Sequence, residues 1–186
     1  MLEMLAAIAI IAIVAGTGVP LTLSSVDRSR AASASRYVSG LMSKARLEAV
    51  RRSRSVAIRF AEEADGYSMR TYADGNGNGV LLRDIADGTD VPVTSPTRLD
   101  HHFAGVSIGI TPGVTDIDSP QLLDASDPIR IGRSTLLSFN PNGASTSGTL
   151  FIRGARATQF AVRIFGITGR TRIFEYDFGA REWRTR

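Results

Sequence analysis

The first twenty residues constrain the fold of this chain more than any other part of its sequence. Met4–Val19 carry no charged side chain, and Glu3 stands directly before this run. As an α-helix rising about 1.5 Å per residue, Met4–Leu23 would span about 30 Å, the hydrocarbon thickness of a bilayer. No basic residue precedes the run, so it lacks the charged start of a secretory signal peptide. The sequence therefore predicts a transmembrane helix over 1–24, which leaves 25–186 for one domain.

Two residues at the ends of this run need an explanation. A charged side chain costs roughly 3 kcal/mol near the centre of a bilayer and less near its surface, so Glu3 would cost little only at the interface. Pro20 has no N–H to donate and its ring clashes with the preceding turn, so it bends or ends a helix. Because a helical pattern continues after Pro20, we expect a kink at this position.

The stretch LEMLAAIAIIAIVAGTGVP resembles the N-terminal helix of type IV pilins and type II secretion pseudopilins. Mature chains of that superfamily begin Phe-Thr-Leu-(Ile/Leu)-Glu, continue with an apolar run and reach a proline about two dozen residues in. Met1–Glu3 align with the third to fifth mature residues, and Pro20 aligns with the kink proline.

This resemblance has three implications. A basic leader and two further residues would precede Met1, a prepilin peptidase would remove the leader, and the new N-terminus would be methylated. Glu3 would pair with the N-terminal ammonium of a neighbouring subunit in a filament, because two charges that are each costly in lipid are tolerable together.

Residues 25–54 again have a helical pattern, in which apolar side chains recur every three or four positions with basic residues off that face. We expect one long helix to leave the membrane and to lay this stripe on a domain. The stretch from Arg36 to Phe60 resembles the part of GspH and FimT minor pilins where the helix ends and the first strand begins. The predicted stripe consists of Val26, Tyr37, Leu41, Ala45, Ala49 and Val50.

The rest of the chain has the alternating pattern of β-strands. A hairpin with its loop at Glu62–Asp65 is expected first, and the stretch from Phe139 to Ile152 resembles the GspH/FimT C-terminal half, where a Phe-x-Pro-x-Gly turn links two strands. Residues 84–128 are the least regular and are predicted to form mainly long surface loops. The fold class is therefore α+β and pilin-like, with a long helix packed on an antiparallel domain. The predicted strands are 55–60, 66–73, 105–110, 134–139, 148–153, 159–165 and 170–178.

The stretch DGNGNG resembles the start of a calcium loop, with Asp74, Asn76 and Asn78 as ligands one, three and five. Position twelve, where a bidentate acid belongs, is Ile85. Asp84 comes one place early, and Asp87 or Asp90 would close only a noncanonical loop. The alternative is a glycine- and asparagine-rich hairpin loop without metal.

No motif indicates an enzyme. His101 and His102 are the only histidines and there is no cysteine, so neither a cysteine-based metal site nor a disulfide framework is present. Adjacent histidines on a strand point to opposite faces, so we expect a solvated pair. No nucleophile elbow or phosphate-binding loop occurs.

Gly169 is predicted to end a turn after which Arg170 and Arg172 share one face of a strand. This matches the Gly-Arg-x-Arg pattern with which FimT-like pilins bind DNA, and arginine forks suit phosphates. The alternative is a pair of solvated strand arginines. Trp183 lies among the basic residues of the C-terminal end, where it would either cover the sheet edge or stack on a base.

The sequence is thus identified as similar to the GspH/FimT-like minor pseudopilins. That resemblance implies a non-enzymatic, single-pass inner-membrane protein with its domain in the periplasm. It would assemble with other pseudopilins on an inner-membrane platform into the pseudopilus of a type II secretion system. Two alternatives stay open: a DNA-binding minor pilin of natural transformation, and a membrane-anchored periplasmic module that does not polymerise.

Overall fold

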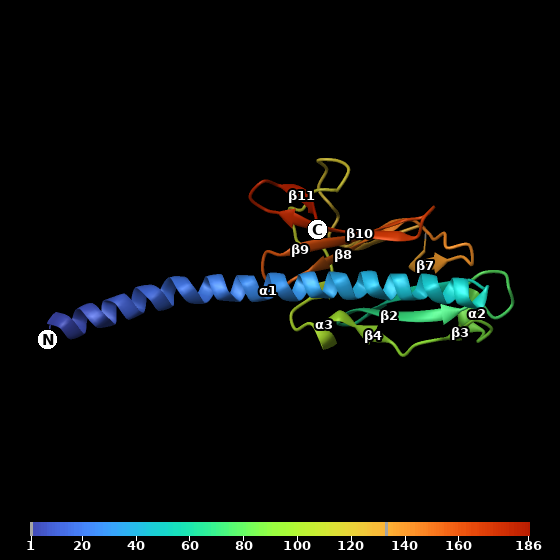
Figure 1. Ribbon diagram of the computed structural model, residues 1–186, viewed down its shortest axis with the longest axis horizontal. Coiled ribbons are helices and arrows are strands. Elements are labelled where there is room, and N and C mark those ends of the chain that lie inside the picture. Colours follow the sequence, from blue (N-terminus) through green and yellow to red (C-terminus); the bar gives the residue numbers. More distant parts are fainter. Residues whose placement is uncertain (1, 133) are drawn as a thin grey trace.

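One long helix dominates the structure. The computed structural model describes residues 2–132 and 134–186, and among the first 21 residues it describes the side chains of only Glu3, Met4 and Ala7. Helix α1 (Leu2–Arg52) is continuous; its first half projects beyond the domain and curves gently, and its second half lies along the domain (Figure 1). The helix passes through position 20, so the proline does not end it, and the kink expected there stays a prediction.

The prediction of a transmembrane helix over 1–24 depends largely on side chains that lie outside the described residues. Within the described residues, no helix is both long and apolar enough to cross a membrane.

The domain consists of two antiparallel sheets, which confirms the α+β class. Sheet A has the strand order β3-β2-β1-β7, and β4 also pairs with β2. Sheet B has the order β11-β10-β9-β8-β5, and β6 also pairs with β8. The strands are β1 (Val56–Glu63), β2 (Gly66–Ala73), β3 (Val91–Pro92), β4 (Thr97–Arg98), β5 (Ser107–Ile108), β6 (Ile129–Ile131), β7 (Leu136–Phe139), β8 (Gly148–Arg153), β9 (Gln159–Phe165), β10 (Arg170–Asp177) and β11 (Glu182–Thr185).

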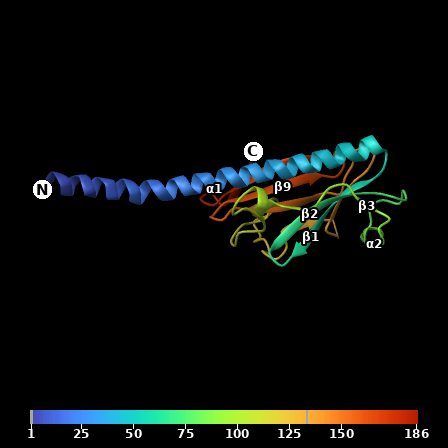
Figure 2. The same cartoon turned by 90° about the horizontal axis from the view of Figure 1, so that it is seen from below.

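Helix α1 packs against both sheets at once. In Figure 1 it runs between β8–β10 on one side and β2 on the other, and in Figure 2 both sheets lie on the same side of the helix. The main core cluster joins its buried face to large side chains from the sheets, among them Phe60, Phe139 and Phe160. The buried helix residues recur every three or four positions: Ala31, Ala34, Val38, Met42, Ala45 and Ala49.

The predicted apolar stripe was therefore only partly right. Ala45 and Ala49 are buried, but Val26, Tyr37 and Val50 are 39 %, 37 % and 47 % exposed. The reason is that the sheets supply the bulky aromatic side chains, so the helix turns its small residues toward them and approaches closely. The helix also ends at Arg52, two residues before the predicted boundary.

Each predicted strand overlaps a strand of the structure, but the one predicted over 105–110 is reduced to the two residues of β5 and the one over 134–139 begins at Leu136. The β1–β2 hairpin is tighter than expected, because Glu63 pairs with Gly66 and only two residues form its turn. The Phe-x-Pro-x-Gly turn after Phe139 is closed by the N–H of Asn140, which donates to the carbonyl of Ala144 at 2.8 Å. This turn carries the chain from sheet A to sheet B.

The segment 84–128 is more structured than the sequence suggested. It contains β3, β4, β5, most of helix α2 (Leu82–Ala86) and helix α3 (Leu99–His102). These elements have two to five residues each, too few to show a period. Residues 111–128 do form a long loop, which covers the face of sheet B turned away from α1 (the outer face). Val114 and Leu123 of this loop pack with Phe151 and Tyr176 of the sheet in a second core.

A buried carboxylate fixes α1 to the domain where the helix leaves it. Asp27 is 6 % exposed and accepts the N–H of Ala155 at 2.8 Å and the N–H of Arg156 at 3.2 Å. Gly154 makes this approach possible, because a Cβ there would lie 2.5 Å from the Asp27 carboxylate. The β8–β9 turn and the helix are thereby held in register.

Replacing Asp27 with alanine removes the buried carboxylate that accepts the N–H groups of Ala155 and Arg156, and a hydrogen bond to a charged group contributes about 1.5–3 kcal/mol. In Asp27→Ala we expect the amides of Ala155 and Arg156 to exchange with deuterium about tenfold faster, measured by hydrogen exchange on the full chain in detergent. Asp65→Ala, which removes an exposed carboxylate at the β1–β2 turn, should leave this exchange unchanged. Equal rates in the wild type and Asp27→Ala would contradict the assignment.

Candidate functional site

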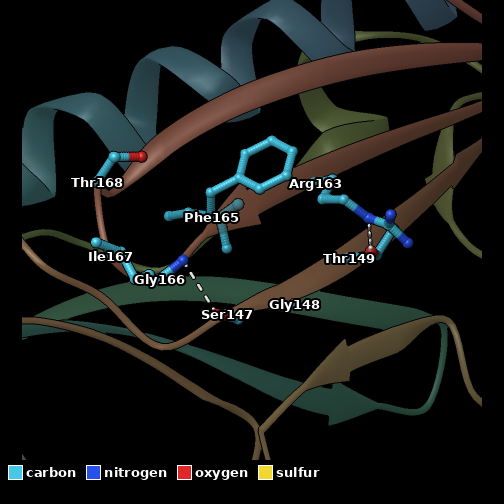
Figure 3. A pocket seen from close by; sticks show the side chains of 9 residues that line it. Ser147, Gly148, Thr149, Arg163, Phe165, Gly166, Ile167 and Thr168 are labelled. Atoms are coloured by element: carbon cyan, nitrogen blue, oxygen red, sulfur yellow. Dashed lines mark hydrogen bonds between the residues drawn. The ribbon is translucent and has the colours of Figure 1, made fainter.

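The outer face of sheet B ends in a groove beside the β9–β10 turn. This shallow groove of about 680 Å³ lies between the start of β8 and the end of β9, and its side chains are drawn in Figure 3. Ile167, at the tip of the turn, is 94 % exposed. The lining residues are Ser147, Gly148, Thr149, Arg163, Ile164, Phe165, Gly166, Ile167 and Thr168.

The β9–β10 turn is anchored to the segment that joins β7 to β8. The N–H of Gly166 donates to the hydroxyl of Ser147 at 3.0 Å (Figure 3), and the carbonyl of Gly166 accepts the N–H of Ser145 at 2.7 Å. The Arg46 guanidinium of α1 holds this segment in turn, because it donates to the carbonyl of Gly143 at 2.9 Å. Gly169 has a φ of 59°, and a Cβ there would lie 2.5 Å from the Gly143 carbonyl. Glycine is therefore required at this position both for its backbone conformation and for the close contact.

The predicted pair of arginines lies next to this turn. Arg170 and Arg172 are exposed and share the outer face of β10, as the sequence predicted, while Thr171 between them points to α1 and shares a hydrogen bond of 2.6 Å with Ser39. The Arg172 guanidinium carbon lies 5.7 Å from the centre of the Phe165 ring. Among the described residues, neither arginine has an acidic partner.

Two further arginines complete a row that sequence reasoning missed. In register across the sheet, Arg130 of β6 pairs with Thr149 of β8, Thr149 with Arg163 of β9, and Arg163 with Arg172 of β10. We call Arg130, Arg163, Arg170 and Arg172 the arginine row. The alternation of side chains along β9 places Arg163 on the outer face of sheet B, and this alternation is the sequence pattern that could have predicted its position in the row.

The long loop neutralises half of this row. Asp116 pairs with Arg130 at 3.1 Å, and Asp118 accepts two hydrogen bonds of 2.8 Å from Arg163. The hydrogen bonds from Arg163 hold the pKa of the Asp118 carboxyl below its usual range. Because like charges directly opposite one another destabilise a sheet, Asp118 also relieves the repulsion between Arg163 and Arg172.

Comparison with known proteins identifies the family. A family model described as type II transport protein GspH matches residues 34–167. This chain belongs to the GspH family. No curated protein and no solved structure gives a match. The matched range covers most of the chain, from within α1 to the β9–β10 turn, so it includes Arg163 but neither Arg170 nor Arg172.

Trp183 has a structural role in this GspH protein. Its indole N–H donates to the carbonyl of Thr115 at 2.8 Å, and its ring lies 5.1 Å from that of Tyr176 and 5.9 Å from that of Phe151. It therefore pins the long loop on the outer face of sheet B. The side chain packs on this face of the sheet, whereas the sequence prediction placed it over the sheet edge.

The candidate calcium residues lie in a loop that is closed by its own hydrogen bonds. Asp74 accepts the N–H groups of Asn76, Gly77 and Gly79 at 3.2, 2.6 and 2.9 Å. Asp84 accepts the side-chain amides of Asn76 and Asn78 at 3.2 and 2.9 Å, and the Asn78 bond is the main cause that lowers its pKa.

A third buried acid, Asp90, closes the other end of this loop. It accepts the N–H of Gly75 at 3.0 Å and that of Leu81 at 2.9 Å. Within the described residues, no group of three or more acids or histidines is arranged to hold a metal ion. A calcium ion at Asp74, Asn76 and Asn78 would have to displace these N–H donors, and its binding stays a prediction.

The remaining candidates are placed as follows. His101 and His102 are both exposed and belong to α3, where the His102 ring lies 5.5 Å from that of Tyr37. Glu3 is exposed in the projecting part of α1, and the side chain of Pro20 lies outside the described residues.

The Asp74–Asp90 loop should depend on Asp90 for its stability. Asp90 is 1 % exposed, so Asp90→Ala removes a buried carboxylate that accepts two backbone N–H groups, and it should lower the free energy of unfolding by about 2 kcal/mol. Denaturant titration of the full chain in detergent measures this change. Asp87→Ala, which alters an exposed acid of the same loop, should stay within about 0.5 kcal/mol of the wild type. Equal midpoints for the two variants would rule out this role.

Proposed function

We propose that this GspH protein is a minor pseudopilin that joins the short pseudopilus of a type II secretion system and has no catalytic activity. It sits in the inner membrane through the N-terminal part of α1, with its domain in the periplasm. A prepilin peptidase removes its leader, and the inner-membrane assembly platform adds it to the filament. The match of residues 34–167 to the GspH family is the observation that carries this proposal.

The shape of the molecule supports the proposal. Asp27 is the first buried residue among the described side chains of α1, and the helix begins at Leu2. About 25 residues, roughly 37 Å of helix, thus project beyond the domain. An apolar helix of this length that its own domain leaves uncovered is suited to packing against the same helix of neighbouring subunits.

Glu3 and Pro20 serve assembly in this proposal. Glu3 sets the register of a subunit by pairing with the N-terminal ammonium of its neighbour, since the two charges lower each other's cost in lipid. Pro20 bends the packed helices. Residues 2–23 form the packing core of the filament.

Replacing Glu3 with leucine should abolish incorporation into the pseudopilus while the protein still enters the membrane. The reason is that the apolar segment is lengthened but the subunit loses its charge partner. Crosslinking between subunits in membranes that express the whole secretion system measures incorporation, and Glu3→Asp, which keeps the charge, is the control.

Unchanged crosslinking of Glu3→Leu would overturn the filament role and favour an anchored periplasmic module that does not polymerise. Mass spectrometry of the native N-terminal peptide gives a second readout: a methylated residue two places ahead of Met1 is expected.

A second candidate function, DNA binding during uptake, is favoured by one observation. Arg170 and Arg172 are exposed on the same face without an acidic partner among the described residues, and Phe165 offers an aromatic ring beside them. Arginine forks and an exposed ring can hold phosphates and a base.

Arg170→Gln/Arg172→Gln tests this second function. If it holds, the full chain in detergent binds duplex DNA, the affinity falls steeply with salt, and the double variant loses about two units of the salt slope. Fluorescence anisotropy at several salt concentrations measures both. The control is Arg30→Gln/Arg156→Gln, with the same charge change at the other end of the domain. Equal losses in the two variants would count against specific binding at Arg170 and Arg172.

A further inference from the structure

The end of the domain from which α1 projects is built by three distant segments of the chain. The β8–β9 turn contacts the helix through Asp27, as described above. The end of β10 contacts it through Glu175, which accepts a hydrogen bond of 3.0 Å from Arg28. The C-terminal residue Arg186 forms an ion pair with the same carboxylate. Folding therefore gathers these segments around the base of the projecting helix, and the C-terminus lies beside α1 in both Figure 1 and Figure 2.

Four exposed arginines lie around this point. They flank the helix on both sides, because Arg28 faces β10 while Arg30 lies on the side of the helix that carries Tyr37, seven residues further on. We call them the arginine collar: Arg28, Arg30, Arg156 and Arg186.

The acids near the collar are too few to neutralise it. Asp27 is buried and its carboxylate is occupied by two backbone amides. Glu175 is shared by Arg28 and Arg186; burial alone would raise its pKa, but these two arginines outweigh that effect and lower it. The hydrogen bond to Glu175 is the main cause that raises the pKa of Arg28, and Asp177 adds to it. Both Asp177 and Glu182 pair with Arg184. Arg30 and Arg156 have no acidic partner among the described residues, so the collar keeps a positive surface at these two side chains.

An apolar surface lies directly beside these charges. A cavity of about 490 Å³ between α1 and β10 has apolar lining from Ala32, Phe160 and Ile173. Its charged lining is Arg28, Arg36, Arg186 and Glu175, so three arginines stand against one carboxylate. A ligand with both an anionic group and a hydrocarbon part would meet complementary surfaces side by side.

The collar lies at the height of lipid headgroups if the apolar run crosses the bilayer. Arg28 and Arg30 follow Leu23 by five and seven residues, about 8 and 10 Å along the helix. Helical side chains point back toward the N-terminus, and long arginine side chains extend to the membrane surface. The headgroup layer on each side of a bilayer is about 5–8 Å thick. Guanidinium forks match the geometry of phosphate oxygens.

We propose that the arginine collar binds the phosphate headgroups of anionic phospholipids in the membrane that holds α1. The inference rests on the proposed function only for the membrane position of the helix. The collar seats the domain on the lipid surface in a defined orientation before assembly. Each exposed arginine at an anionic surface strengthens binding by about fivefold.

Arg30→Gln/Arg156→Gln is the variant of choice, because neither side chain forms an ion pair among the described residues and the fold stays intact. The full chain is placed in nanodiscs of phosphatidylglycerol and phosphatidylcholine in equal amounts, and native mass spectrometry after mild detergent extraction counts the lipids retained. We expect the wild type to retain phosphatidylglycerol preferentially and the variant to lose about 25-fold of that preference.

Arg170→Gln/Arg172→Gln is the matched control, with the same net charge at the opposite end of the domain, and it should keep the wild-type preference. Equal lipid ratios in all three proteins, or equal losses in both variants, would overturn the proposal. The proposal would also be overturned if Arg30→Gln/Arg156→Gln lost duplex DNA binding while its lipid ratio stayed unchanged, because the collar would then bind nucleic acid. Failure of the proposed function would be seen in a different experiment: the crosslinking of Glu3→Leu would be unchanged, whereas the lipid ratio does not report on filament assembly.

Discussion

The close packing of one helix face against two sheets is the constraint on which the rest of the structure depends. Alanines at positions 31, 34, 45 and 49 let α1 approach both sheets, and the aromatic side chains of the sheets fill the space between them. Sheets A and B share this core with α1, so the second half of the helix is part of the domain. Any force on the projecting half of α1 is therefore transmitted to both sheets.

This arrangement gives the domain two chemically different ends. At the end where α1 leaves, the β8–β9 turn and the C-terminus bring arginines around the helix; Glu175 pairs with two of them, and the carboxylate of Asp27 is occupied by backbone amides. At the far end, the β9–β10 turn exposes Ile167 beside an arginine row that the long loop neutralises only in part. The domain thus has an arginine-rich end around the helix and, at its other end, a groove beside a partly neutralised row of arginines.

The long loop 111–128 is structural in this protein. Its apolar residues form a second core on the outer face of sheet B, Trp183 holds it in place, and Asp116 and Asp118 pair with arginines beneath it. Without that cover, Phe151 and Tyr176 would be exposed on an open sheet face, at a cost that grows with the apolar area left in water.

The sequence alone determined the long helix, the main strands, the α+β class and the family, because each rests on a local pattern: an apolar run with Glu3 and Pro20, period-two alternation, and a Phe-x-Pro-x-Gly turn. It also placed Arg170 and Arg172 on one face, since alternation in a strand is local. Only the tertiary structure decided which face of α1 is buried, because that depends on bulk supplied by strands far away in the chain. The tertiary structure also decided that Arg163 pairs with Asp118 and that Arg28 and Arg186 share Glu175. The two residues of each pair are between 11 and 147 positions apart in the chain. A pattern within one segment therefore cannot predict them.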